Sequence, residues 1–263
     1  MKKHKSIVDS RRNKVMIILQ KQGRVLVDDL VAELQVSPLT IRRDLQYWEE
    51  QNAIERFYGG AKLVNSIVDC DDPTQTNALY KHAIAKYAAQ YVKEGDTIFI
   101  NTSSTALLVL KYIRNKRCTV ITNNGKAIFE EHDPLISIVL TGGELRIPKE
   151  SMVGEFALNN LNRVSANKAF IGCSGINVTS GITTAILQEV AINETMVNRT
   201  NGQVFVLADH TKVGNQHSFI SGSIDKVTYL ITDQLADDTQ VSEIENSNVT
   251  VVKLKPLLKI ENN

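Results

Sequence analysis

The chain has 263 residues and a formal net charge of +1, and 43% of its residues are hydrophobic and 22% charged. This composition is typical of a folded globular protein and excludes wholesale disorder, and the length predicts one large domain or two ordinary ones. No apolar run approaches the ~20 residues that cross a bilayer. No apolar signal-peptide core follows the basic N-terminus. We therefore expect a cytoplasmic protein that has no membrane partner.

The three cysteines, Cys70, Cys118 and Cys173, are widely spaced and odd in number. They form no CxxC pair, so the pattern indicates neither a disulfide framework nor a zinc site. Reduced thiols are the expected state in the cytoplasm. The sequence implies no cofactor and no metal ion.

The charge is unevenly distributed along the chain. Residues 1–62 carry 12 basic and 8 acidic side chains, whereas residues 63–263 carry 18 basic and 21 acidic ones. A basic head on a mildly acidic body suggests that the head contacts a polyanion. A small excess of this kind is common, however, so the pattern of the segment matters more than its charge.

The first part of the chain predicts two helices separated by a short β-type run. Apolar residues at helical spacing predict a helix over 11–22, and Gly23 is suited to end it. The β-type run covers 25–27. A second, short helix follows, for which Asp28 fits the N-cap.

Ser37 and Pro38 predict the start of a third helix. The serine can cap free N–H groups, and a proline at the first helical position loses no hydrogen bond. After this helix, residues 53–61 alternate and then turn, which indicates a β-wing. Three short helices and a wing together predict a winged helix-turn-helix.

The third helix has an apolar side and a polar side. Ile41, Leu45 and Trp48 lie on one side, and Arg43 and Gln46 lie on the other. Arginine can pair bidentately with guanine and glutamine with adenine when such a helix enters the major groove. An arginine pair alone is more often a solvated helix face, but the surrounding pattern favours DNA. The residues that we expect at DNA are Ser37, Pro38, Thr40, Arg42, Arg43, Gln46, Arg56 and Lys62.

Residues 36–45 (VSPLTIRRDL) and 56–61 (RFYGGA) are similar to the signature of the DeoR family of bacterial transcriptional regulators. The resemblance implies a DNA-binding head joined to a C-terminal sensor for phosphorylated sugars or related metabolites. It also implies regulation of transcription, most often repression.

The remainder of the chain predicts a linker and an α/β body. Residues 63–76 are polar and aperiodic, which indicates a linker between domains at 1–62 and 77–263. Helical patterns over 83–92 and 106–113 alternate with short apolar runs. The strand candidates include 97–100, 120–121, 136–140, 169–171, 204–207 and 229–231. This alternation predicts a mainly parallel sheet with helices on its faces.

Folds of this kind bind ligands in the loops at the carboxyl ends of their strands. Residues 101–105 offer hydroxyls and helix-start N–H groups that suit a phosphate, although they could equally be an over-capped helix start. Glycines in 122–125 and 141–144 allow a close approach to the backbone, or simply make tight turns. The longest such loop is expected at 172–184.

By resemblance, the body is similar in fold to ribose-5-phosphate isomerase and glucosamine-6-phosphate deaminase. Lys212 would supply a compact positive charge for phosphate and Asp209 could accept from sugar hydroxyls, unless the two form a surface pair. The effector-binding residues that the resemblance implies are Thr102, Ser103, Ser104, Thr105, Thr122, Asn123, Gly142, Gly143, Asn177, Asp209 and Lys212.

Two positions depart from the family pattern. The first loop reads Asn101-Thr102-Ser103-Ser104-Thr105, whereas the family usually has Asp-x-Gly-Thr-Thr, and the missing glycine changes the expected phosphate geometry. Asn177 stands where many relatives have aspartate, and it cannot act as a carboxylate.

Two classes of function fit these features. The first is a DNA-binding regulator, a dimer or larger homo-oligomer, in which a sugar phosphate biases two arrangements of the heads. The alternative is a sugar-phosphate isomerase or deaminase with an accessory head, which needs a base beside the substrate carbon. Glu189, His210 and His217 are possible bases, but no spacing links them. We therefore expect a regulator of a carbohydrate-metabolism operon and no catalytic residues.

Overall fold

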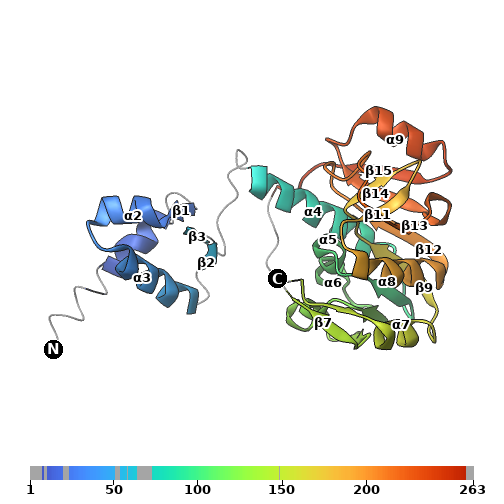
Figure 1. Cartoon of the computed structure of the whole chain (residues 1–263), viewed down its shortest axis with the longest axis horizontal. Helices are drawn as coiled ribbons and strands as arrows, with labels where there is room; N and C mark the ends of the chain where they lie inside the picture. The colour runs from blue at the N-terminus through green and yellow to red at the C-terminus, as the bar shows by residue number, and fades with distance from the viewer. Residues whose placement is uncertain are drawn as a thin grey trace. The chain divides into compact units, whose positions relative to one another are not determined.

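The computed structural model describes residues 8, 11–19, 24–50, 54–57, 59–63, 73–147 and 149–258. It divides into two compact units, Met1–Asp69 and Cys70–Asn263, whose elements Figure 1 labels. The features predicted at 20–23, residue 53, Tyr58 and residues 64–72, which include Cys70, lie outside the described residues. No helix in the described part of the chain is long and apolar enough to cross a membrane.

The N-terminal unit contains the predicted helices and wing. A helix covers 11–19, and the elements after it are β1 (Arg24–Leu26), α2 (Val27–Leu34), α3 (Pro38–Glu50), β2 (Ile54–Phe57) and β3 (Gly60–Leu63). Strand β3 pairs antiparallel with both β1 and β2, so the wing is part of a three-stranded sheet. Gly60 permits this pairing, because a Cβ there would lie 2.3 Å from the carbonyl oxygen of Val25.

Helix α2 begins two residues earlier than the sequence predicts. Leu26 is the N-cap without a side-chain capping bond, and Asp28 lies in the first turn, where its charge still favours the helix dipole. Val27 is the first residue of the helix and not the last of the strand, and its side chain is buried in the core of the unit. The buried core consists of Val15, Leu19, Val25, Val27, Leu30, Ile41, Leu45, Ile54 and Ala61.

The C-terminal unit is built on a seven-stranded parallel sheet in the order β15-β14-β12-β9-β4-β5-β6. Its strands are β4 (Thr97–Ile100), β5 (Cys118–Thr122), β6 (Ile136–Leu140), β9 (Ala166–Ile171), β12 (Thr200–Leu207), β14 (Tyr229–Asp233) and β15 (Thr250–Leu254). Every strand predicted in this unit is present. Strands β4 and β9 are neighbours, but the chain continues from β4 to β5 on one side and from β9 to β12 on the other. This reversal creates a switch point between β4 and β9.

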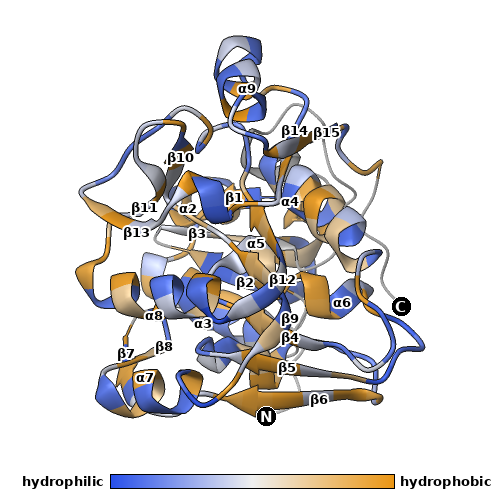
Figure 2. Cartoon of the chain, turned by 90° about the vertical axis from the view of Figure 1, so that its right-hand side faces the viewer, coloured by the Kyte–Doolittle hydropathy of each residue, from blue (hydrophilic) through white to orange (hydrophobic). Residues whose placement is uncertain are grey.

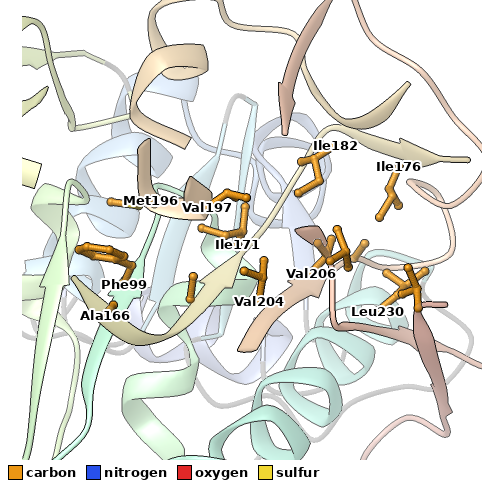
Figure 3. Close-up of a cluster of buried hydrophobic side chains, with 14 of the residues drawn as sticks. Phe99, Ala166, Ile171, Ile176, Ile182, Met196, Val197, Val204, Val206 and Leu230 are labelled. Carbon is orange, nitrogen blue, oxygen red and sulfur yellow. The ribbon is translucent and has the colours of Figure 1, made fainter. Parts of the chain in front are cut away.

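Helices cover both faces of this sheet, and Figure 2 accordingly shows β4 and β5 in hydrophobic colours. One face packs against α4 (Pro73–Ala89), α5 (Ser104–Leu107) and α6 (Val109–Tyr112) through Phe170 and Phe205. The other packs against α7 (Glu155–Leu161), α8 (Leu187–Asn198) and α9 (Asp238–Glu245). Figure 3 shows this second cluster, in which Ile171 lies between Val197 of α8 and Val204 of β12.

The structure differs from the prediction at several elements of this unit. Helix α4 covers Pro73–Ala89 instead of the predicted 83–92, so it begins within the predicted linker and ends three residues earlier. The helix expected over 106–113 is divided at Leu108. The segment expected to be the longest loop, 172–184, contains the antiparallel hairpin β10 (Gly175–Asn177) and β11 (Gly181–Thr184), which β13 (Phe219–Gly222) extends. The sequence reading also missed β15 and the hairpin of β7 (Glu144–Arg146) and β8 (Ser151–Val153).

Candidate functional sites

Helix α3 begins as its sequence predicts. The Ser37 hydroxyl accepts a hydrogen bond from the Thr40 backbone N–H at 3.2 Å, and the two hydroxyl oxygens are 2.9 Å apart. Pro38 is the first helical residue. The two hydroxyls therefore stabilise the helix start, and both retain lone pairs or protons for a further partner.

A buried carboxylate fastens α3 to the helix at 11–19. Asp44, which is 1% exposed, accepts hydrogen bonds from Arg11 at 2.5 and 3.1 Å and from Arg12 at 3.4 Å. The hydrogen bond to Asp44 raises the pKa of Arg11. Trp48 Nε1 donates to the Arg12 carbonyl oxygen at 3.0 Å. The acidic residue of the predicted motif is therefore structural, and Arg42 and Arg43 remain exposed on the opposite side.

The wing places two further predicted residues at the surface in ion pairs. Arg56 Nε lies 2.6 Å from Glu49 Oε2, and Lys62 Nζ lies 3.0 Å from Glu55 Oε2. Exposed pairs of this kind contribute about 0–1 kcal/mol, so a DNA phosphate can displace the carboxylates at little cost.

The C-terminal unit contains a pocket of about 790 Å³ at the switch point of the sheet. The loops after β4, β9 and β12 contribute to it, together with the N-terminal half of α8. Six of the predicted effector residues line this pocket: Thr102, Ser103, Ser104, Thr105, Asp209 and Lys212. The prediction that these loops meet at the carboxyl ends of the strands therefore agrees with the geometry.

Five predicted effector residues do not line the pocket. Asn177 Oδ1 accepts from the Ser180 N–H and hydroxyl at 2.7 and 2.8 Å, so it holds the turn between β10 and β11. Asn123 is buried, and its side chain donates to the Met152 carbonyl at 3.1 Å, which ties β5 to β8. The remaining residues of this group are Thr122, Gly142 and Gly143.

Local backbone geometry explains why Thr122, Gly142 and Gly143 occur at their positions. The Thr122 hydroxyl accepts from the Asn124 N–H at 3.1 Å within the turn after β5. Gly142 and Gly143 both have positive φ, at 69° and 108°. A Cβ on Gly143 would lie 2.5 Å from the Val153 carbonyl oxygen. Turn formation and close packing therefore account for these glycines.

Asn101 joins the loops after β4 and β9. Its Nδ2 donates to the Gly172 carbonyl at 2.8 Å and to Asn193 Oδ1 at 3.0 Å. Its Oδ1 accepts from the Gly172 N–H at 3.0 Å and from the Ser103 N–H at 3.3 Å. An ionised aspartate could not donate the first pair of bonds. The amide at this position, a departure from the family pattern, thus matches its surroundings.

Ser103 occupies space that Gly172 leaves open. A Cβ on Gly172 would lie 1.9 Å from Ser103 Oγ and 2.1 Å from Ser103 Cβ. Ser103 has φ −68° and ψ 134°, which any residue adopts, and its hydroxyl caps α5 by accepting from the Ala106 N–H at 3.3 Å. The loop therefore does not need a glycine at residue 103.

A nearly buried carboxylate, Glu189 of α8, lies at the wall of the pocket. It accepts hydrogen bonds from Thr102 Oγ1 at 3.1 Å and from Thr184 Oγ1 at 3.2 Å, and Lys149 Nζ lies 3.7 Å from it. Charged and hydroxyl groups from three separate segments thus meet here. An ion pair this long is readily exchanged for a ligand group.

The pocket wall carries both signs of charge. Its basic residues are Lys81, Lys126, Lys149 and Lys212, and its acidic ones are Glu130, Glu150, Glu189 and Asp209. Burial raises the pKa of Glu130. Because the charges balance in number, an anionic ligand has to be recognised by the local placement of lysines and not by a net positive wall.

The sequence-based prediction did not include several residues that line the pocket. Lys81 of α4, Lys126 and Lys149 have the pattern of ordinary solvated lysines. Glu189 was named only as a possible base, and Asn193 was not named. The two residues are four positions apart in α8, and this spacing could have predicted a polar face toward a ligand.

The possible bases named from the sequence do not meet in the pocket. Of the three possible bases, only Glu189 lines it. His210 Nδ1 is 3.0 Å from an Asp233 carboxylate oxygen, and His217 is exposed. Burial raises the pKa of the Cys173 thiol to about 12, with Lys212 opposing and Asp209 adding to the shift, so this thiol stays protonated near neutral pH. Among the described residues, no cluster of three His, Cys, Asp or Glu side chains could hold a metal ion.

Comparison with known proteins gives matches over both units. Residues 11–67 match the DeoR-like helix-turn-helix domain, and residues 76–234 match the DeoR C terminal sensor domain. The chain is 33% identical over 257 residues to the uncharacterized HTH-type transcriptional regulator YulB of Bacillus subtilis, covering 96% of this chain and 99% of that protein. It is 31% identical over 229 residues to the glycerol-3-phosphate regulon repressor of Escherichia coli, covering 85% and 90%.

Among solved structures, a ribose 5-phosphate isomerase A from Methanocaldococcus jannaschii aligns with a TM-score of 0.37 at 19% identity, covering 52% of this chain and 54% of that chain. A likeness at this level carries no conclusion about activity.

Proposed function

The chain belongs to the DeoR family of transcriptional regulators, and on this premise we propose that it represses a carbohydrate-metabolism operon under the control of a sugar phosphate. The relative from Escherichia coli is named for a glycerol-3-phosphate regulon, which supports a small phosphorylated metabolite as the class of effector. In this proposal the N-terminal unit binds operator DNA and the pocket of the C-terminal unit binds the effector.

The observation that carries the effector proposal is the set of groups gathered in the pocket. Hydroxyls of Ser104 and Thr105 and the ammonium of Lys212 suit a phosphate, which accepts hydrogen bonds and carries negative charge. Asp209 and Glu189 suit the hydroxyls of a polyol, because ionised carboxylates only accept hydrogen bonds. The proposed effector therefore carries an anionic group together with hydroxyl groups.

DNA binding is proposed to require at least a dimer. A single small helix-turn-helix unit gives limited specificity, and dimers of such units bind two half-sites related by symmetry. The DNA-facing set remains Ser37, Pro38, Thr40, Arg42, Arg43, Gln46, Arg56 and Lys62. We place the regulator in the cytoplasm, where its operator and effector would meet.

Regulation without turnover fits the site better than isomerase or deaminase chemistry. A base for proton transfer must reach the substrate carbon. Of the three bases named from the sequence, Glu189 is the one that lines the pocket, and it already accepts hydrogen bonds from Thr102 and Thr184. Incubation with aldose and ketose phosphates, followed by nuclear magnetic resonance, should show no interconversion; conversion that Glu189→Gln abolishes would establish an enzyme.

Thermal unfolding against a panel of sugar phosphates tests the effector proposal, with the unphosphorylated sugars as controls. A ligand at 100 times its dissociation constant adds about 2.7 kcal/mol to the stability of the native state. Lys212→Met should remove the shift, whereas Lys226→Met, at an exposed lysine of the same unit, should keep it. A shift that survives Lys212→Met unchanged would remove Lys212 from the site.

A further inference from the structure

Helix α3 has a continuous exposed stripe. Residues spaced by three, four and seven positions lie on one face of a helix. Leu39, Arg42, Arg43 and Gln46 have this spacing, and all four are exposed. The buried residues Ile41, Leu45 and Asp44 occupy the other side. The stripe therefore begins with a leucine at the N-terminal end of α3.

Leu39 is 57% exposed, although it is a large apolar side chain. A single exposed leucine is common and needs no explanation by itself. Here, however, it belongs to a stripe that is otherwise polar and basic. The one acidic residue between Pro38 and Trp48 is Asp44, which is buried and paired with Arg11 and Arg12. The stripe thus offers positive charge and one apolar group to an anionic partner.

DNA presents one apolar group in its major groove, the C5-methyl group of thymine. Every other edge there displays hydrogen-bond donors or acceptors, which a leucine would desolvate without replacing. Residues near the N-terminal end of a recognition helix are the ones that reach the base edges. Leu39 combines the apolar chemistry, the exposure and the position that a thymine contact requires.

We propose that Leu39 reads the methyl group of a thymine in each operator half-site and so acts as a specificity-determining residue beside Arg43. This inference rests on the proposed role of α3 as the recognition helix. The arginines of the stripe supply hydrogen bonds and charge, whereas Leu39 adds a preference that charge cannot supply.

The test begins with an operator selected by the full-length chain from random duplex DNA. Each thymine of that operator is then replaced by uracil, which removes the methyl group and leaves base pairing intact. Burying one methyl group stabilises by about 0.8 kcal/mol, equivalent to about fourfold in affinity. Fluorescence anisotropy should show about fourfold weaker binding at one thymine per half-site.

Two variants assign this sensitivity to a residue. Leu39→Ala should bind the thymine and uracil operators equally. Ile17→Ala, which removes an equally exposed apolar side chain (60% exposed) from the helix at 11–19, should keep the fourfold difference. Thermal unfolding of both variants verifies that the fold is intact.

Different failures have different meanings. If the chain selects a defined operator but no thymine methyl group affects its affinity, or if Leu39→Ala keeps the sensitivity, the Leu39 proposal is wrong and the regulator proposal stands. If the chain selects no sequence at all, the proposed role of α3 fails together with the inference.

Discussion

The contact between Gly172 and Ser103 gives the sharpest prediction about the pocket. In Gly172→Ala the new methyl group would lie 1.9 Å from Ser103 Oγ and 2.1 Å from Ser103 Cβ, so the loops after β4 and β9 must separate. Overpacking of this kind costs about 1–3 kcal/mol. Both loops line the pocket, so effector affinity should fall as well.

A second substitution should remove the clash. Ser103→Gly opens the space that the methyl group needs, and it costs only a few tenths of a kcal/mol for the lost cap of α5. The variant with both substitutions should therefore be more stable than Gly172→Ala alone, which is a strongly non-additive result for neighbouring residues.

Calorimetry is the suitable assay, because the single tryptophan, Trp48, belongs to the N-terminal unit and its fluorescence does not report on the pocket. In a domain of 150–250 residues, 1 kcal/mol shifts Tm by about 2–4 °C. If the destabilising effects of Gly172→Ala and Ser103→Gly simply add, the proposed steric conflict is refuted.

Three other predictions concern separate features. Asp44→Ala should destabilise the N-terminal unit by about 1–3 kcal/mol, because it leaves Arg11 and Arg12 without their carboxylate. Trp48 fluorescence in denaturant measures the loss, and an unchanged unfolding midpoint would contradict the prediction. Burial, aided by the charge of Lys111, lowers the pKa of His82 to about 4. The unfolded chain therefore binds a proton first, and the free energy of unfolding should fall as the pH drops from about 6.5 to 4. His82→Phe should flatten this part of the plot of stability against pH, and an unaltered slope would contradict the prediction. Arg43→Ala should weaken operator binding by about 1–3 kcal/mol and relax the preference at one base position. If the variant binds every operator sequence as tightly as the parent chain does, Arg43 reads no base.

Local chemistry made part of this structure predictable. Ser37 and Pro38 begin α3 because the capping bond and the fixed φ of proline depend on neighbours in sequence alone. The run at 97–100 is a strand buried on both faces because the sheet is parallel and covered by helices. Such features need no knowledge of distant residues.

Features that depend on distant residues were missed or misplaced. Lys149 and Glu189 lie 40 residues apart in the chain and meet only through the packing of α8 beside β8. Asn123 and Asn177 have side chains suited to a ligand, but Ser180 occupies Asn177 Oδ1, and Asn123 Nδ2 donates to Met152 while its Oδ1 is buried without a hydrogen-bond partner. A polar residue in a loop can serve either the backbone or a ligand, and sequence alone does not separate these roles.

The central claim is that one ligand, bound in the C-terminal unit, changes the affinity of the N-terminal unit for DNA. The direct measurement is operator affinity with and without the sugar phosphate that stabilises the protein most. Coupling between sites is typically 5–150-fold. We predict a change of at least about fivefold for the parent chain and for Lys226→Met, and none for Lys212→Met. A sugar phosphate that saturates the pocket yet leaves operator affinity unchanged would contradict the account.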